Sequence, residues 1–140
     1  MTKYWLCVTN EENWRVVRSK LVWGVSDRYK RKMEMLEEGD LLVFYVRPKR
    51  IGGIFKAASA PYVDKKPIFS SEGFRTGEVF PNRVKLEPLL VPDEPIPFEP
   101  LIEKLKFIKN KEKWTGYIRG AMRLIPEEDY KAIEEALRAK

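Results

Sequence analysis

The stretch LLVFYV at Leu41–Val46 is the longest apolar run in the chain. Its β-branched and aromatic residues favour a strand, and because both alternating sets of positions are apolar, we expect both faces of that strand to be covered. Six residues fall far short of the ~20 that a membrane-spanning helix needs. The N-terminal residues also lack the pattern of a signal peptide. We therefore expect a cytoplasmic protein without a membrane partner.

Strand and helix signals follow on both sides of this run. Upstream, Tyr4–Thr9 is predicted to be a strand, and apolar residues at helical spacing predict short helices within residues 14–21 and 29–36. Downstream, residues 54–59 and 83–91 are predicted to be strands. With five or six short, mostly antiparallel strands and helices at the periphery, the pattern favours an α+β fold built on a small barrel.

Local signals predict how these segments are joined. Thr9 and Glu12 have the spacing of a capping box at a helix start. The pair Gly52-Gly53 is predicted to turn the chain into the next strand.

The C-terminal part continues the same domain, which we expect to span residues 1–140. Residues 88–100 hold five of the ten prolines, which predicts an extended strap over the surface rather than a central strand. Residues 101–107 are predicted to form a short helix. Pro126 and the acidic residues after it predict a final helix over residues 126–139.

Composition narrows the possible functions. The chain has 27 Lys and Arg against 21 Asp and Glu, a net charge of +6, no His and one Cys. Without His there is no Ser–His or Cys–His pair and most zinc sites are excluded, and Cys7 alone forms neither an internal disulfide nor a CxxC motif, so we expect no catalysis. The absence of Gln beside abundant Lys and Glu indicates a heat-adapted source. The alternative is a small enzyme using Asp40, Asp64, Glu72 or a desolvated Lys56.

Positive charge is clustered, with aromatic residues between the clusters, as expected of a track for nucleic-acid phosphates. The candidate phosphate-binding residues are Arg28, Arg31, Arg47, Lys49, Arg50 and Arg83. Arg83 could instead form a salt bridge with Glu78 or Glu87. A protein-interaction module that binds an acidic partner would carry the same charge, and this alternative stays open.

An ordered set of short motifs resembles the EVE domain, a member of the PUA-like superfamily that is related to the YTH readers of methylated adenine. The matching motifs are Tyr4-Trp5-Leu6, Asn13-Trp14, Trp23-Gly24-Val25, Gly39-Asp40 before the apolar strand, Gly53-Ile54-Phe55, Tyr62 with Asp64, and Phe80-Pro81-Asn82-Arg83. The resemblance implies a PUA-like pseudo-barrel of five to six strands. It also implies a pocket for one nucleobase, often modified, from RNA or DNA, with no metal or cofactor.

By this resemblance Trp23 would stack on the base, and Asn10 or Asn13 would hydrogen-bond to its edge. Gly24 would let a ligand approach the backbone closely, and Ser26, two residues further on, is a further candidate for the base-binding pocket. The resemblance does not decide which residue forms the second aromatic wall, and the candidates are Tyr45, Phe69, Phe74 and Phe80. On this interpretation, replacing Trp23 with Ala would weaken binding strongly and leave the fold intact.

Overall fold

The computed structural model describes residues 1–139. Its strands are β1 (Tyr4–Thr9), β2 (Val22–Val25), β3 (Leu41–Val46), β4 (Arg50–Ala57), β5 (Tyr62–Val63), β6 (Asn82–Leu90), β7 (Ile96–Pro97) and β8 (Met122–Leu124). Its α-helices are α1 (Glu11–Lys20), α2 (Lys30–Met35) and α3 (Glu127–Arg138), and its 3₁₀ segments are η1 (Asp27–Tyr29), η2 (Glu99–Lys104) and η3 (Trp114–Tyr117).

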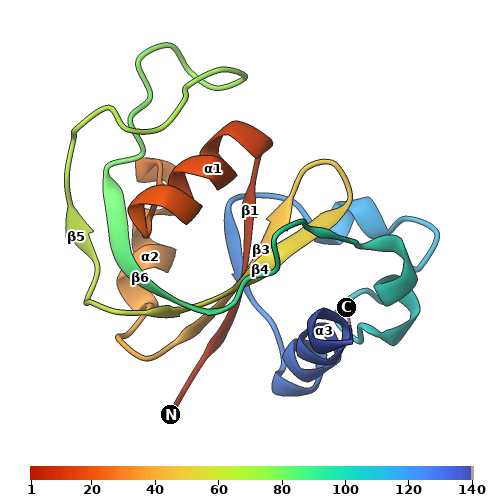
Figure 1. The fold of residues 1–140 in the computed structure, drawn as a ribbon. Coiled ribbons are helices and arrows are strands. Elements are labelled where there is room, and N and C mark those ends of the chain that lie inside the picture. The colour runs from red at the N-terminus through yellow and green to blue at the C-terminus, as the bar shows by residue number, and fades with distance from the viewer. Residues whose placement is uncertain (140) are drawn as a thin grey trace.

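The strands form one curved sheet in the order β2-β6-β4-β3-β1-β8, with β5 beside β6 and β7 beside β4. Among the strands of residues 1–139, β1 and β3 form the one parallel pair. In Figure 1, α1 and α2 lie on one side of the curved sheet and α3 lies on the other. The α+β pseudo-barrel of mostly antiparallel strands is therefore confirmed.

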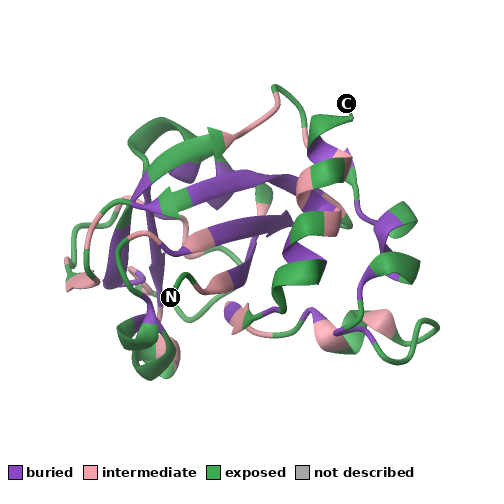
Figure 2. Cartoon of the chain, turned by 90° about the horizontal axis from the view of Figure 1, so that it is seen from below, coloured by how far each residue is buried: buried purple, intermediate pink, exposed green. Residues whose placement is uncertain are grey.

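The apolar run predicted to be covered on both faces lies near the middle of the sheet. Its alternate residues enter two separate cores: Phe44 packs with the group under α1 and α2, and Tyr45 packs with the group under α3. Figure 2 shows the central strands almost entirely buried, with exposed residues on the outer sides of the helices. A strand alternates its side chains between faces, so only a run that is apolar at every position can serve two cores.

The start of α1 differs from the predicted capping box. Asn10, not Thr9, is the N-cap residue, and its side chain accepts a hydrogen bond from the backbone N–H of Asn13 at 2.8 Å. Thr9 is the last residue of β1 and is paired with Val46 of β3. The strand thus extends one residue further than the capping box requires.

Two glycines predicted to turn the chain lie instead inside β4. A Cβ added to Gly52 would lie 2.5 Å from the Trp14 ring, so the missing side chain makes room for α1 to pack on the sheet. The pairing of β3 with β4 shifts register opposite this point, between Phe44 and Tyr45. Gly52 therefore serves close packing at an irregularity in the ladder rather than a turn.

The Pro-rich strap takes more part in the sheet than predicted. Its start belongs to β6, where Pro88 pairs with Phe55, and its centre forms β7, which pairs with β4. Phe98 follows and is fully buried in the core under α3. The predicted helix at residues 101–107 is a 3₁₀ segment displaced toward the N-terminus, η2.

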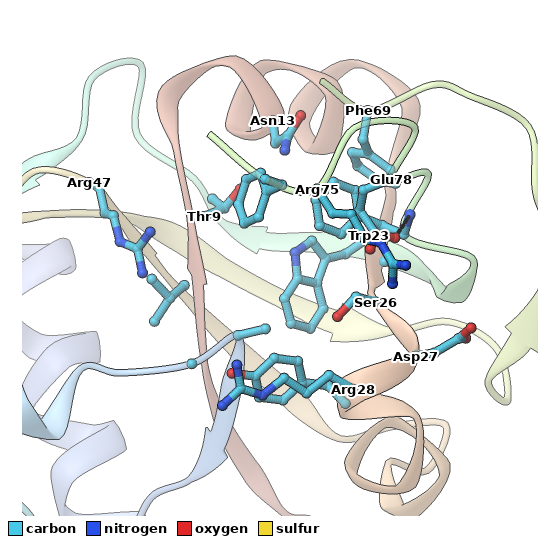
Figure 3. A pocket seen from close by; sticks show the side chains of 17 residues that line it. Thr9, Asn13, Trp23, Ser26, Asp27, Arg28, Arg47, Phe69, Arg75 and Glu78 are labelled. Carbon is cyan, nitrogen blue, oxygen red and sulfur yellow. Dashed lines mark hydrogen bonds between the residues drawn. The ribbon is translucent and has the colours of Figure 1, made fainter. Parts of the chain in front are cut away.

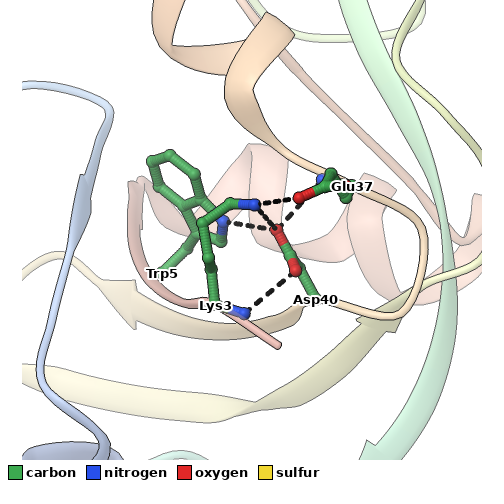
Figure 4. A network of polar contacts seen from close by, with 4 residues as sticks. All are labelled: Lys3, Trp5, Glu37 and Asp40. Carbon is green, nitrogen blue, oxygen red and sulfur yellow. Dashed lines mark hydrogen bonds and ion pairs between the residues drawn. The ribbon is translucent and has the colours of Figure 1, made fainter. Parts of the chain in front are cut away.

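A buried carboxylate fixes the N-terminus against the turn that precedes β3 (Figure 4). Asp40 is 1% exposed and accepts three hydrogen bonds, from the backbone N–H groups of Lys3 and Glu37 and from Nε1 of Trp5, each at 3.0 Å. The ammonium of Lys3 lies 3.7 Å from the same carboxylate and also pairs with Glu37. This cluster sets the start of the β1–β3 pair.

The C-terminal helix carries a tyrosine whose titration is linked to stability. Burial raises the pKa of Tyr130 to about 12, and the carboxylate of Glu134, 3.2 Å from the phenol, adds to the shift. The folded chain holds the phenol proton of Tyr130 more tightly than the unfolded chain does. The contribution of this proton to the free energy of unfolding is therefore complete below pH 10 and is lost as pH rises toward 12. We expect Tyr130→Phe to flatten the fall in unfolding free energy across this window by about 2–3 kcal/mol. Unfolding in guanidinium chloride at several pH values measures the difference. If the unfolding free energies of the wild-type protein and of Tyr130→Phe fall in parallel with pH, the prediction is contradicted.

No helix within residues 1–139 is long and apolar enough to span a bilayer.

Candidate nucleic-acid interface

A cavity of about 570 Å³ opens where the ends of β1, α1 and β2 meet η1. The loop between β5 and β6 forms a second side, and residues 120–121, just before β8, form a third. Segments far apart in the chain therefore converge on one hollow.

Trp23 of β2 lies at the centre of this lining, with Asn13 and Phe69 above it and Arg28 below it in Figure 3. The indole is only 3% exposed and stands edge-on to Phe44, with 5.5 Å between ring centroids. No described residue accepts a hydrogen bond from its Nε1, so this donor is unused. Because Trp23 is both a core residue and a wall of the cavity, we expect Trp23→Ala to cost about 3–5 kcal/mol of stability in addition to its effect on binding.

Three phenylalanines form a second aromatic part of the lining. Phe69 and Phe74 each stand edge-on to Phe80, at 6.0 and 5.0 Å between centroids, and all three line the cavity. Phe74 is 45% exposed and is the most accessible ring of the three. Tyr45 lies outside this cavity, because its position in β3 points to the other core, where it packs on Phe98.

The two asparagines expected at the base edge have structural partners instead. Asn10 caps α1 and does not line the cavity. Asn13 does line it, but its Oδ1 accepts the backbone N–H of Ser70 at 2.7 Å and its Nδ2 donates to the carbonyl of Ser70 at 3.2 Å. Asn13 therefore tethers the aromatic loop to α1.

Two carboxylates at the cavity each have one oxygen in use. Asp27 accepts a hydrogen bond from Nδ2 of Asn82 at 3.0 Å, and Glu78 accepts the backbone N–H of Phe80 at 2.8 Å. The second oxygen of each carboxylate, like the hydroxyl of Ser26, has no hydrogen bond to any described residue. The Glu78 oxygen and the Ser26 hydroxyl can meet hydrogen-bond donors on a ligand, whereas the Asp27 carboxylate points away from Trp23 in Figure 3.

The rim of the cavity is held from inside by Arg83, for which the sequence leaves both a phosphate contact and a structural salt bridge open. Arg83 is 1% exposed; its Nε donates to the carbonyl of Phe80 at 3.0 Å, and Nη2 donates to the carbonyls of Val79, at 2.8 Å, and Lys66. Asp64, 3.7 Å away, is its ion-pair partner, in place of the expected Glu78 or Glu87. Burial lowers the pKa of Arg83, and the Asp64 carboxylate opposes that shift. The guanidinium is committed to the fold and is not available to phosphate.

Gly24 is required by the same rim. A Cβ there would lie 2.4 Å from the carbonyl oxygen of Phe80 and 2.9 Å from Cγ of Arg83. We expected a ligand to approach the backbone at Gly24, but Phe80 and Arg83 of the chain itself occupy that space. Phe80 has a φ of 51°, a left-handed conformation that this packing holds in place.

Three arginines line the cavity without an ion pair to any described residue: Arg28, Arg47 and Arg75. Arg28 also lies over the ring of Tyr29, at 5.8 Å. Lys49 borders a neighbouring cavity, and exposed Arg31 lines neither cavity.

Arg50 is already engaged, since it pairs with Glu11 at 3.7 Å and donates to the carbonyl of Arg47. The Lys-rich stretch is partly engaged as well. Lys106 pairs with Glu128, and Lys111 donates to the carbonyls of Ile102 and Leu105.

Sequence reasoning missed several residues of this cavity. They are Val8, Thr9, Tyr29, Arg75, Gly120 and Ala121, together with the carboxylates of Asp27 and Glu78. Only the sheet topology brings residues 8–9 and 120–121 together, through the pairing of β1 with β8. No local sequence signal could have found them. Among residues 1–139, no cluster of three or more His, Cys, Asp or Glu side chains could hold a metal.

A curved, mostly antiparallel sheet with peripheral helices and an aromatic hollow at its edge defines a PUA-like protein. The model of the EVE domain matches residues 3–136, and the chain belongs to that family. It is 49% identical to a UPF0310 protein of Pyrococcus abyssi, over 96% of this chain and 99% of that relative. Archaeal relatives fit the composition that indicated a heat-adapted source.

Solved structures share the fold at low sequence identity. The Pho92 YTH domain in complex with m6A superimposes with a TM-score of 0.68 at 12% identity, covering 98% of this chain and 84% of that one. The human THYN1 protein, in complex with 5-methylcytosine containing DNA, gives a TM-score of 0.66 at 13% identity and covers 99% of both chains. The predicted relation to YTH domains is confirmed at the level of the fold.

Proposed function

We propose that this protein is a non-catalytic reader that takes one modified base of a nucleic-acid strand into the cavity beside Trp23. The observation that carries the proposal is the cavity itself, about 570 Å³, whose lining includes the rings of Trp23, Phe69, Phe74 and Phe80 and arginines without an ion pair to any described residue. Base stacking on aromatic rings and phosphate attraction to arginine are the two forces that hold single strands. The solved structures of similar fold with m6A and with 5-methylcytosine DNA support the same chemistry.

The polar groups favour bases that carry an amino group. The free oxygen of Glu78 can accept a hydrogen bond, as an exocyclic N–H of adenine or cytosine requires. The indole N–H of Trp23 supplies one donor. Uracil and thymine have no exocyclic amino group, so we expect them to bind more weakly.

Phe74 provides the test of this pocket that least disturbs the fold. Because its ring is 45% exposed, Phe74→Ala removes a stacking surface at small cost to the core. We expect about tenfold weaker binding of oligonucleotides containing N6-methyladenine or 5-methylcytosine, since a stacked base is worth about 1–3 kcal/mol. Equilibrium titration at low salt, with RNA and DNA and with the unmodified strands beside them, measures the change.

The matched control is Leu89→Ala. Leu89 is 51% exposed and lies on β6 outside the cavity, so its loss should leave affinity unchanged. If the wild-type protein binds none of these strands at low salt, or if both variants weaken binding equally, the reader proposal fails. Binding of an acidic peptide instead would favour the protein-interaction module.

A further inference from the structure

A second cavity of about 590 Å³ adjoins the first. It lies between the loop at residues 47–49 and the turn at residues 114–120. Arg28, Tyr29, Arg47 and Gly120 line both cavities. The two hollows are therefore contiguous, and a ligand that fills one borders the other.

The lining of the second cavity is strongly cationic. Arg28, Arg47, Lys49 and Arg119 line it, and no Asp or Glu does. All four are exposed, and none of their side chains forms an ion pair within residues 1–139. Arg50, Arg83 and Lys106, by contrast, each have a carboxylate partner. Like charges gathered in one concave surface repel one another and attract an anion.

An aromatic ring completes this surface. Trp114 of η3 lines the cavity while its ring is tilted against the buried Phe98, with 5.4 Å between centroids. The turn behind it is fixed, because Arg123 donates to the carbonyl of Tyr117 and the hydroxyl of Tyr117 accepts the backbone N–H of Asn110. An indole held beside four cations suits a base attached to a phosphate.

Gly120 and Tyr29 form the boundary between the two cavities. Gly120 has a φ of 81°, and a Cβ there would lie 2.8 Å from the hydroxyl of Tyr29. The backbone thus passes close to the tyrosine, and this contact belongs to the lining of both cavities.

We infer that the second cavity binds the nucleotide next to the base held in the first, with the phosphate on Arg119 and Lys49 and the base against Trp114. This inference rests on the proposed function and extends the site from one base to a dinucleotide. The phosphate that links the two nucleotides would lie near Arg28 and Arg47, which the cavities share.

The test compares ligands of increasing length. Adenine and cytosine, unmodified or as N6-methyladenine and 5-methylcytosine, are titrated as nucleosides and within dinucleotides that extend either way and carry a terminal phosphate on the added nucleotide. We expect the second nucleotide to raise affinity about tenfold. Arg119→Ala should remove most of that gain and lower the salt slope by about one, while nucleoside binding stays unchanged. Trp114→Phe should keep part of the gain, because a smaller ring still stacks.

Lys113→Ala is the matched control, since it removes an exposed cation next to Trp114 that does not line the cavity. If dinucleotides bind no more tightly than nucleosides, or if Arg119→Ala and Lys113→Ala act equally, the second subsite is overturned while the reader function stands. If neither nucleosides nor strands bind, the proposed function fails and the subsite fails with it.

Discussion

Replacing Arg83 with Leu should lower the free energy of unfolding by about 3–5 kcal/mol, because three carbonyl groups and one carboxylate lose their buried cation. The guanidinium is 1% exposed and donates to the carbonyls of Phe80, Val79 and Lys66. Leucine fills part of the volume but supplies no donor. Unfolding in guanidinium chloride measures the loss, and we expect the slope of unfolding free energy against denaturant concentration to stay unchanged.

The same substitution should also damage the pocket. Arg83 lies over the ring of Phe69 at 5.3 Å and fixes the backbone of Phe80, so two of the pocket's aromatic residues depend on it. We expect Arg83→Leu to weaken base binding well beyond the effect of Phe74→Ala, under conditions where the variant is folded. Arg83→Lys keeps the charge but cannot reach three carbonyls at once, so it should recover part of the stability and little of the binding. Normal stability in Arg83→Leu would show that the buried guanidinium is dispensable.

The fold was predictable because its strongest signals are local. A run apolar at every position demands two covered faces, and β3 supplies both cores. The details that failed depend on tertiary packing. Gly52 resembles a turn residue in sequence, but its role is to admit the Trp14 ring, and nothing within β4 itself indicates that contact.

The site was less predictable for the same reason. The sequence pointed to Trp23, and the structure places it at the cavity, but the role of Asn13 is set by Ser70, 57 residues away. Arg83 looks like a phosphate ligand in a basic chain until its burial is known. Local motifs identify residue types suited to a base, whereas long-range contacts decide which of them remain unpaired.

Asp40 offers the comparison that separates the stability of the fold from the integrity of the pocket. Its carboxylate accepts three hydrogen bonds at 3.0 Å while 1% exposed, and Asp40→Ala leaves all three donors without a partner. We expect a loss of about 3–5 kcal/mol, similar to that of Arg83→Leu. Asp40→Asn retains one acceptor oxygen, so it should lose less, about 1–2 kcal/mol.

The two positions should nevertheless differ in binding. Asp40 and its partners Lys3, Trp5 and Glu37 do not line the cavity beside Trp23, whereas Arg83 contacts Phe69 and Phe80. Below its unfolding transition, Asp40→Ala should therefore bind oligonucleotides as the wild-type protein does, while Arg83→Leu should not. Equal losses of affinity in both variants, measured at matched fractions folded, would mean that the pocket responds to global stability alone. Arg83 would then have no specific part in holding the rim.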